Sequence, residues 1–372
     1  MKKRLCWVIS NLDYSKQFDH IEQHLPDTYE LSYIFLADQV PTLYNLFKER
    51  GRQVFYIKYI SKKNMLASMV NLYRIFRQIK PDIVHTHLFE ASFGGIIAAW
   101  LAGVKNRIHS RHHSNEAHLY YPLRAVYYDK LLNLLATKIV AVSDVVAEVL
   151  TGLENVPLDK IEVIPHGFQL EDIVAQPATL KCVKEDHNLV NNYPIIGVVS
   201  RFVEWKGVQY IIPAFGKLLK DYPQAKLVMA NARGGYSAEL DALLKETLKE
   251  DQYVLIDVER RIFELFKTFD VFVHTPIMKE VEAYGQVYIE SLASEVPSVF
   301  TLSGIANSFI KDKENAVVVP YQDSEAIYNS IKLLLADNVL QQKIVKKGKA
   351  DVWKLYHINL MMSRLNSVYS EL

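Results

Sequence analysis

Short runs of β-branched and aromatic residues alternate with longer amphipathic segments along the whole chain. In the first half the runs lie near residues 5–9, 53–57, 83–87, 107–110 and 139–142; in the second they lie near 195–199, 226–229, 253–256, 271–274, 298–301 and 316–319. Between the runs, apolar residues recur every three or four positions, as in helices packed on a core. This alternation predicts parallel β-sheets with helices on both faces.

The alternation is interrupted once, by a polar and irregular stretch that follows Gly167. A chain of 372 residues is also too long for one ordinary hydrophobic core. We therefore predict an N-terminal Rossmann-like domain at residues 1–170, a linker at 171–193 and a C-terminal Rossmann-like domain at 194–350. The last helical pattern, at 351–372, is expected to cross back to the first domain.

The composition excludes several classes of protein. The 43 basic and 42 acidic side chains nearly cancel, so no overall field would gather nucleic acid. The only two cysteines, Cys6 and Cys182, are far apart and favour a reducing compartment over a disulfide framework. The apolar run at the start is too short for a signal peptide, and no window is long enough for a transmembrane helix. We expect a cytoplasmic protein.

Two cations follow the first buried run of the second half. Arg201 comes directly after this run, and Lys206 stands beside Gly207, before the next helical pattern. Ligands of open α/β sheets bind beyond the carboxyl ends of the strands, so these cations could hold a diphosphate at a helix start. Solvated surface cations are the alternative, because most arginines and lysines are exposed.

A second segment contains two glutamates, Glu282 and Glu290, on either side of Gly285. A helix is predicted to begin near Gly285, whose freedom allows the backbone to approach a ligand, and the free amides of its first turn favour anionic or hydroxyl-rich groups. Eight residues turn a helix about 80° beyond two full turns, so the two carboxylates would face different parts of one ligand. The alternative is a pair of solvated glutamates.

Histidines are concentrated near the ends of two strands of the first half, in the segments IVHTH and RIHSRHHSN. His112 and His113 belong to the second of these, and each could be a donor, a base or a satisfied interior group. A metal site is not expected, because there is no His-Glu-x-x-His and neither cysteine has a companion at ligand spacing. A dehydrogenase is disfavoured, because neither half has Gly-x-Gly-x-x-Gly after its first strand, and no phosphate loop is present.

Taken in order, these segments resemble those of the family 4 glycosyltransferases. The matching segments are PDIVHTH, RIHSRHH, AVSDVVAEVL followed by IEVIPHG, VVSRFVEWKG and EAYGQVYIESLASEVPSVF, between Pro81 and Phe300. The resemblance implies the GT-B fold, an α/β architecture in which two Rossmann-like domains with parallel sheets face each other across a cleft.

The resemblance also implies a role for each candidate residue. Arg201 and Lys206, with Gly207 beside them, would hold the donor diphosphate, and Glu290 would bind its ribose. Glu282 and the main chain at Gly285, Gln286 and Val287 would face the donor sugar, and His112 or His113 would approach that sugar from the other domain.

The activity implied is transfer of a sugar from a nucleotide donor, with a UDP-sugar favoured, to a glycan or lipid-linked acceptor, with retention of configuration and without a cofactor or metal. Bacterial surface polysaccharide synthesis is the expected setting. The segment SGIAN, which has Asn307 where the family usually has a glutamate, and the polar segment NLDYSKQFDH leave the sugar and the acceptor open. A nucleotide-sugar epimerase and a non-catalytic accessory subunit are the alternatives.

The segment from Lys48 to Lys80 interleaves basic and aromatic residues and suggests peripheral contact with the anionic inner face of a membrane. The alternative for this segment is a solvated helix face beside core aromatics.

Overall fold

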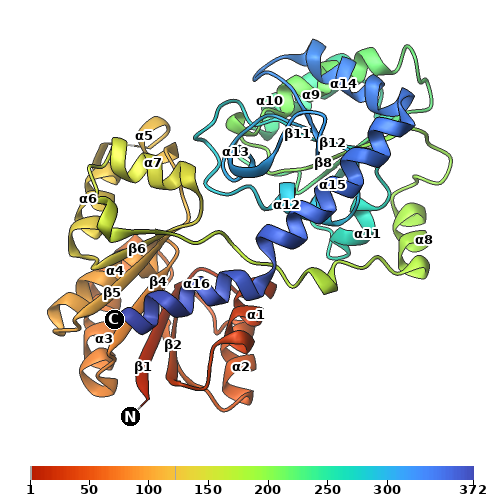
Figure 1. Ribbon diagram of the computed structural model, residues 1–372. Helices are drawn as coiled ribbons and strands as arrows, with labels where there is room; N and C mark the ends of the chain where they lie inside the picture. The colour runs from red at the N-terminus through yellow and green to blue at the C-terminus, as the bar shows by residue number, and fades with distance from the viewer. Residues whose placement is uncertain (1, 122) are drawn as a thin grey trace. The chain divides into compact units, whose positions relative to one another are not determined.

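The computed structural model describes residues 2–121 and 123–372 and divides the chain into two compact units. The first unit contains the chain as far as Phe168 together with Ile358–Leu372, and the second contains Gln169–His357. Both are α/β units, and each is described here by itself (Figure 1).

The first unit is built on a seven-stranded sheet in the order β3-β2-β1-β4-β5-β6-β7, and every pairing in it is parallel. The strands are β1 (Lys3–Ser10), β2 (Tyr29–Ala37), β3 (Gln53–Lys58), β4 (Ile83–His87), β5 (Asn106–Arg111), β6 (Lys138–Ala141) and β7 (Ile161–Val163). Its helices are α1 (Lys16–His24), α2 (Thr42–Glu49), η1 (Lys62–Asn64), α3 (Met65–Ile79), α4 (Phe89–Leu101), α5 (Glu116–Leu119), α6 (Leu123–Leu135), α7 (Asp144–Gly152), η2 (Leu158–Lys160) and α16 (Ile358–Glu371).

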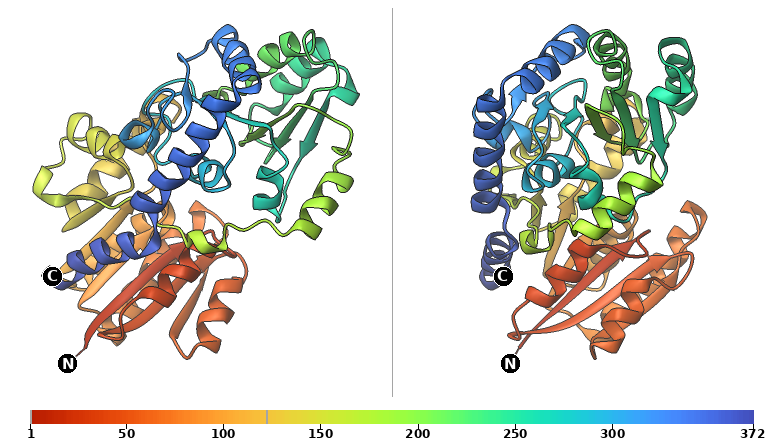
Figure 2. Two further views of the ribbon diagram at one scale, coloured as in Figure 1. Left: turned by 45° about the vertical axis from the view of Figure 1, so that its right-hand side comes forward. Right: turned by 90° about the vertical axis from the view of Figure 1, so that its right-hand side faces the viewer.

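Helices cover both faces of this sheet because successive strand residues point to opposite sides. In β1, Trp7 packs on the face shared with α16, whereas its neighbour Val8 packs on the face covered by α3 and α4. The last helix of the chain therefore completes the core of the first unit. Lys3 donates to the carbonyl of Ser370 at 2.9 Å, and all three views show the two chain termini close together (Figures 1 and 2).

The second unit is built on a six-stranded parallel sheet in the order β10-β9-β8-β11-β12-β13. The strands are β8 (Ile195–Val199), β9 (Lys226–Ala230), β10 (Tyr253–Ile256), β11 (Val271–His274), β12 (Ser298–Phe300) and β13 (Val317–Val318). Its helices are η3 (Leu170–Asp172), α8 (Pro177–Asp186), η4 (Glu204–Lys206), α9 (Val208–Leu218), α10 (Ser237–Thr247), η5 (Glu250–Gln252), α11 (Ile262–Phe266), α12 (Gln286–Ala293), α13 (Ala306–Phe309), α14 (Ser324–Ala336) and α15 (Asn338–Tyr356).

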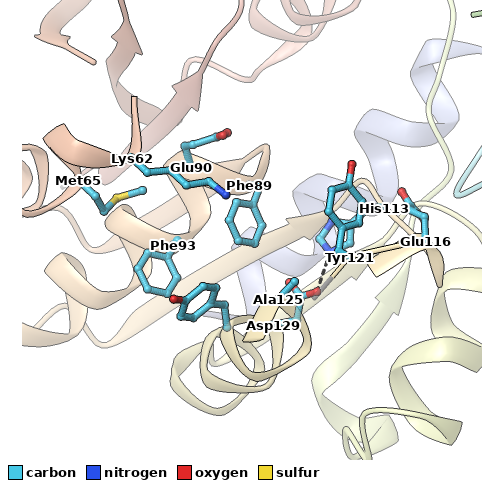
Figure 3. A pocket seen from close by; sticks show the side chains of 11 residues that line it. Lys62, Met65, Phe89, Glu90, Phe93, His113, Glu116, Tyr121, Ala125 and Asp129 are labelled. Atoms are coloured by element: carbon cyan, nitrogen blue, oxygen red, sulfur yellow. Dashed lines mark hydrogen bonds and ion pairs between the residues drawn. The ribbon is translucent and has the colours of Figure 1, made fainter. Parts of the chain in front are cut away.

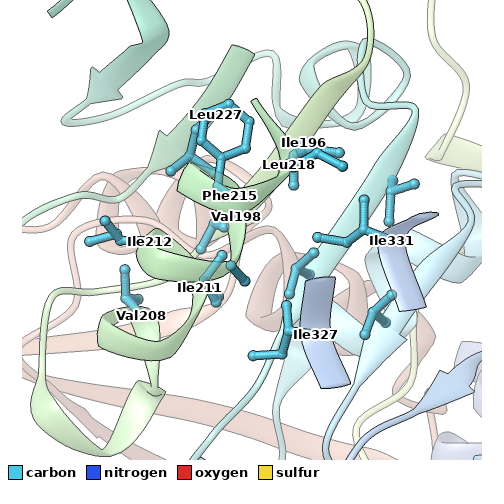
Figure 4. Packing of buried hydrophobic residues seen from close by; sticks show 14 of the residues in the cluster. Ile196, Val198, Val208, Ile211, Ile212, Phe215, Leu218, Leu227, Ile327 and Ile331 are labelled. Carbon is cyan, nitrogen blue, oxygen red and sulfur yellow. The ribbon is translucent and has the colours of Figure 1, made fainter. Parts of the chain in front are cut away.

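Aliphatic side chains from α9 and α14 meet those of the central strands in the core of this unit (Figure 4). Ile211 and Phe215 lie four positions apart on α9 and are both fully buried, as expected for one face of a helix. Ile327 and Ile331 are likewise four positions apart on α14 and fully buried. This packing holds β8 and β11 at the centre of the sheet.

Three features differ from the sequence predictions. Residues 171–193 are not an irregular linker, because α8 begins with Pro177 in its first turn, forms a ten-residue helix and belongs to the second unit. The final helical pattern is divided at His357, so only α16 lies in the first unit. Strands β2 and β7 were not predicted, although β2 is almost entirely buried.

Candidate functional site

The second unit presents a switch point where ligands of doubly wound sheets bind. From β8 the chain proceeds outward to β9 and β10, then returns to place β11 on the other side of β8. A crevice opens beyond the carboxyl ends of two such neighbouring strands. The segments that follow β8 and β11 contain all eight candidate residues of this half, which are Arg201, Lys206, Gly207, Glu282, Gly285, Gln286, Val287 and Glu290.

Lys206 and Glu282 are brought together although they are 76 positions apart in the sequence. The ammonium of Lys206 donates to Oε1 of Glu282 and forms an ion pair with it. His274, the last residue of β11, lies 3.1 Å from the same oxygen through Nε2. Because an ionised carboxylate can only accept, His274 donates from Nε2.

The charge on Glu282 follows from these partners. Burial by itself raises the pKa of this carboxyl, but the Lys206 charge and the His274 hydrogen bond outweigh burial and lower the pKa to about 2. Burial also lowers the pKa of His274, so its imidazole stays neutral. Lys206 has three donor hydrogens, and Glu282 occupies one of them. The remaining donors can bind another anion.

A close backbone approach holds the two segments together. Gly207 has φ +72°, and a Cβ at this position would lie 1.9 Å from the carbonyl oxygen of Thr275. Next to it, the amide of Ile277 donates to the carbonyl of Trp205 at 3.0 Å. Glycine at 207 therefore lets the Lys206 segment lie directly on the segment that leads to Glu282.

Helix α12 begins within the same crevice. Gly285 caps it with φ +84°, and the amides of Gln286 and Val287, in the first turn, donate to no described residue. Gly304 lies behind Glu282, where a Cβ would come within 2.8 Å of that residue's own Cβ. The amides of the first turn thus form a donor group that suits an anion or a hydroxyl.

Glu290 lies one turn further along α12 and is half-buried. Nε2 of Gln286 donates to its Oε1 at 2.9 Å. Burial raises the pKa of Glu290 to about 7, and the Gln286 hydrogen bond opposes this rise only in part. The other carboxylate oxygen can accept hydrogen bonds from a ligand.

Arg201 is exposed at the end of β8, and its guanidinium forms no hydrogen bond or ion pair with another described residue. Its guanidinium is available for a ligand, and the structure does not place it against any of the other candidates.

The two candidate histidines lie in the first unit and have different surroundings. The ring of His112 stacks on His166 with the centroids 5.3 Å apart, and burial keeps the pKa of His112 well below its usual value. His113 contacts Oδ2 of Asp129 through Nε2 at 2.9 Å. His109, expected near the end of a strand, lies inside β5, where its side chain is buried against Ser92.

A cavity of about 480 Å³ lies beside His113 (Figure 3). Its walls come from η1, α3, α4 and α6 and are mainly apolar, with Phe89, Phe93 and Tyr128 among them. The charged groups that line it are Lys62, Glu90, Glu116 and Asp129. Behind Asp129, the fully buried Arg111 forms ion pairs with Asp129 at 3.1 Å and with Glu154 at 2.6 Å, which fixes the position of the Asp129 carboxylate.

Taken together, the second unit offers cations, helix amides and two carboxylates to one ligand, which suits a molecule with both phosphates and hydroxyls. In residues 2–121 and 123–372, no group of histidine, cysteine or acidic side chains is arranged to hold a metal ion. Within the same residues, no helix has the length and apolarity needed to cross a bilayer.

His274 and Ser303 were not among the candidates. His274 holds the Glu282 side chain, and Oγ of Ser303 accepts from the Glu282 amide at 3.3 Å. His274 could have been selected by the same rule that selected Arg201, because it ends a central strand. Nothing in the sequence around Ser303 indicates its contact.

Two family models match the chain, one in each half. The model for Glycosyltransferase Family 4 matches residues 23–172, and the model for Glycosyl transferases group 1 matches residues 183–351. Between them they cover most of both units.

Curated relatives and solved structures agree with these matches. The capsular polysaccharide biosynthesis glycosyltransferase CapM of Staphylococcus aureus is 26% identical over 82% of this chain and 80% of its own length. The UDP-Gal:alpha-D-GlcNAc-diphosphoundecaprenol alpha-1,3-galactosyltransferase of Escherichia coli is 25% identical over 74% of this chain and 72% of its own length. The fold is that of Anabaena Alr3699/HepE in complex with UDP and glucose, with a TM-score of 0.85, 16% identity and full coverage of both chains.

Proposed function

We propose that this chain transfers a sugar from a UDP-sugar to a lipid-linked saccharide, with retention of configuration. The chain belongs to the GT-B glycosyltransferases and is related to enzymes of bacterial polysaccharide synthesis. The observation that carries the proposal is the contact of Lys206 with Glu282 at the switch point of the second unit, beside the free amides of α12. Structures of HepE with UDP and with UDP-glucose support the choice of donor.

The donor diphosphate is assigned to Arg201 and Lys206. Arg201 has no competing partner among the described residues, and Lys206 keeps two donor hydrogens beyond the one used by Glu282. Both cations follow β8, so they can approach neighbouring phosphate oxygens by charge-assisted hydrogen bonds.

The other ends of the donor are assigned to the two glutamates. Glu290 accepts hydrogen bonds from the ribose hydroxyls through the oxygen that Gln286 leaves unused. Glu282 stays ionised at neutral pH and, with the amides of Gln286 and Val287, holds hydroxyls of the sugar.

In the proposed reaction, an acceptor hydroxyl forms a bond to the anomeric carbon on the face from which the diphosphate departs. The bond between this carbon and the phosphate oxygen breaks, and the hydroxyl proton passes to the departing diphosphate. Arg201 and Lys206 stabilise the negative charge that develops on this leaving group. No metal is required for this step.

The acceptor is assigned to the cavity of the first unit. Its aromatic walls can stack against a sugar ring, and the Asp129 carboxylate fixes the ring of His113 beside it (Figure 3). The E. coli relative, whose acceptor is a GlcNAc-diphosphoundecaprenol, supports an acceptor of the lipid-linked class.

Transfer to polyprenyl-diphosphate N-acetylglucosamine, used as the acceptor probe, tests this assignment. Arg201→Ala and Lys206→Ala should each lower kcat by on the order of a hundredfold, the loss typical of one charge-stabilising donor. Arg260→Ala and Lys343→Ala remove exposed cations elsewhere in the second unit and should leave the rate unchanged. Full activity of both site variants would contradict the proposal.

Donor recognition can be measured separately, by thermal unfolding with a panel of nucleotide sugars. A ligand at about a hundred times its Kd stabilises a protein by about 2.7 kcal/mol. A nucleotide-sugar epimerase would convert its donor when no acceptor is present, and an accessory subunit would bind the donor without turnover in any mixture.

A further inference from the structure

The first unit exposes an unusual amount of apolar surface in one part of the chain. Among the described residues, 13 of the 26 large apolar side chains that are exposed lie between Ile60 and Leu134. Soluble monomers rarely expose large contiguous apolar patches, so this part of the chain is the candidate for a contact surface.

Helix α3 contributes one exposed apolar stripe. Leu66, Val70 and Tyr73 are spaced four and three positions apart, so they share a face, and Leu66 is 77% exposed. The opposite face of α3 is in the core through Leu72 and Phe76. The exposed stripe is therefore not part of the hydrophobic core of the first unit.

Helix α6 contributes a second stripe with the same spacing. Tyr127, Leu131 and Leu134 are all exposed, Leu134 by 72%, and Tyr128 adjoins them. Helix α4 packs against both α3 and α6 and ends in the exposed Trp100 and Leu101 (Figure 1). We refer to the exposed apolar residues of these helices as the three-helix face. They are Leu66, Val70, Tyr73, Trp100, Leu101, Tyr127, Tyr128, Leu131 and Leu134.

The three helices meet at the acceptor cavity. Met65 of α3, Phe93 of α4 and Tyr128 of α6 line the same cavity, and the rings of Phe93 and Tyr128 are 5.1 Å apart (Figure 3). Tyr128 belongs both to the three-helix face and to this cavity, so the face adjoins the pocket assigned to the acceptor.

The charged residues on η1 and α3 themselves are all positive. Lys62, Lys63, Arg74, Arg77 and Lys80 are exposed, no acidic residue lies between Tyr59 and Pro81, and none of these five cations forms an ion pair with another described residue. The surface predicted from the sequence was broader and partly wrong. Tyr59 and Phe76 are buried in the core. Arg50 forms ion pairs with Asp19 and Glu22 at 2.6 Å, and Arg52 forms one with Glu22 at 2.5 Å.

We propose that the three-helix face, with the cations of η1 and α3, lies on an anionic lipid bilayer and brings the acceptor cavity to the membrane surface. Exposed aromatic and aliphatic side chains bordered by unpaired cations are the chemistry of an interfacial helix on anionic headgroups. A protein partner would need acidic groups to match the cations, and a second copy of the chain would place these cations against each other. The membrane contact would bring the enzyme to its lipid-linked acceptor, so its purpose rests on the proposed function.

Flotation with vesicles tests the proposal on the full chain. Wild type should float with vesicles of phosphatidylcholine and phosphatidylglycerol, and much less with phosphatidylcholine alone. Arg74→Glu combined with Arg77→Glu should lower the partition coefficient by at least about thirtyfold, because loss of each cation near an anionic surface alone removes about a fivefold factor and each new carboxylate is repelled by the surface. Leu66→Ser combined with Val70→Ser should lower binding to both kinds of vesicle.

Matched controls change the same chemistry on the second unit. Lys343→Glu with Lys346→Glu reverses two exposed lysines of α15, and Val258→Ser with Val339→Ser removes two exposed apolar side chains. Neither control should alter flotation. Equal losses in the controls, no flotation of wild type, or equal binding to both vesicle types would each overturn the proposal.

Light scattering and donor binding separate the remaining outcomes. Wild type could prove to be a dimer that does not bind vesicles and that Leu66→Ser with Val70→Ser converts to a monomer. This result would make the three-helix face an interface between two copies of the chain and would overturn the proposal. Thermal stabilisation by a UDP-sugar should be the same in every variant. Failure of flotation with donor binding intact contradicts only the membrane contact, whereas flotation without donor binding contradicts only the proposed function.

Discussion

Glu290 is the candidate residue whose charge changes near neutral pH. Its pKa of about 7 arises from burial, so it is protonated at mildly acidic pH. A carboxylate accepts hydrogen bonds from two ribose hydroxyls better than a neutral carboxyl does. We therefore expect donor affinity to increase as pH rises through 7, and Glu290→Gln to remove this dependence. Calorimetric titration with a UDP-sugar measures it cleanly, because the diphosphate of a sugar nucleotide does not titrate in this range.

The same residue should affect the stability of the free protein in the opposite direction. The pKa of this carboxyl is 4.5 in the unfolded chain and about 7 in the folded protein. The group therefore stabilises the folded state below pH 4.5, and this stabilisation is lost as the pH rises through 7. Denaturant unfolding of wild type and Glu290→Gln from pH 5 to 8 should show that slope only in wild type. Glu295→Gln, on an exposed side chain nearby, is the control. A slope that persists in Glu290→Gln would assign the titration to another group.

At the level of elements, the site depends on how closely the segment after β8 approaches the segment after β11. Gly207→Ala would place a methyl group 1.9 Å from the Thr275 carbonyl and force alanine into a left-handed conformation. We expect a loss of about 3 kcal/mol or more in the free energy of unfolding, together with loss of the donor thermal shift, because Lys206 and Glu282 separate. Gly235→Ala, where nothing lies within 4 Å, should preserve both.

The sequence predicted the strands of the second unit more completely than those of the first. All six strands from β8 to β13 coincide with short apolar runs, because strands buried on both faces are nearly continuously hydrophobic. Strand β2 was missed although its burial is similar, and α8 was missed because its polar sequence resembles a linker. Four of the ten residues of α8 are charged, and only Val183 is buried.

Contacts within the site were harder to predict than the elements. Arg201, Lys206 and the two glutamates were selected because they follow strands or begin helices. The pairing of Lys206 with Glu282, and the part His274 plays in it, depends on β11 lying next to β8 rather than next to β10. Local patterns cannot supply a strand order, so neither the pairing nor the low pKa of Glu282 could be derived from the sequence.

At the level of the whole molecule, the last helix of the chain belongs to the core of the first unit. Leu365 of α16 is 2% exposed and lies in the same cluster as Trp7 and Tyr33, whereas Leu218 of α9 is fully buried in the core of the second unit. Leu365→Ala and Leu218→Ala each remove a buried side chain, at a cost of about 2–5 kcal/mol. Because each unit has its own core, we expect this cost to fall on one unit at a time.

Hydrogen exchange followed by mass spectrometry resolves where stability is lost. Leu365→Ala should speed exchange in β1, β2 and β4 and leave β8 and β9 unchanged, although the substitution lies only seven positions before Leu372. Leu218→Ala should do the reverse, and saturating UDP-sugar should restore protection only in the second variant, since the donor is assigned to the second unit. Equal acceleration in both sheets for either variant would mean that the two units unfold together.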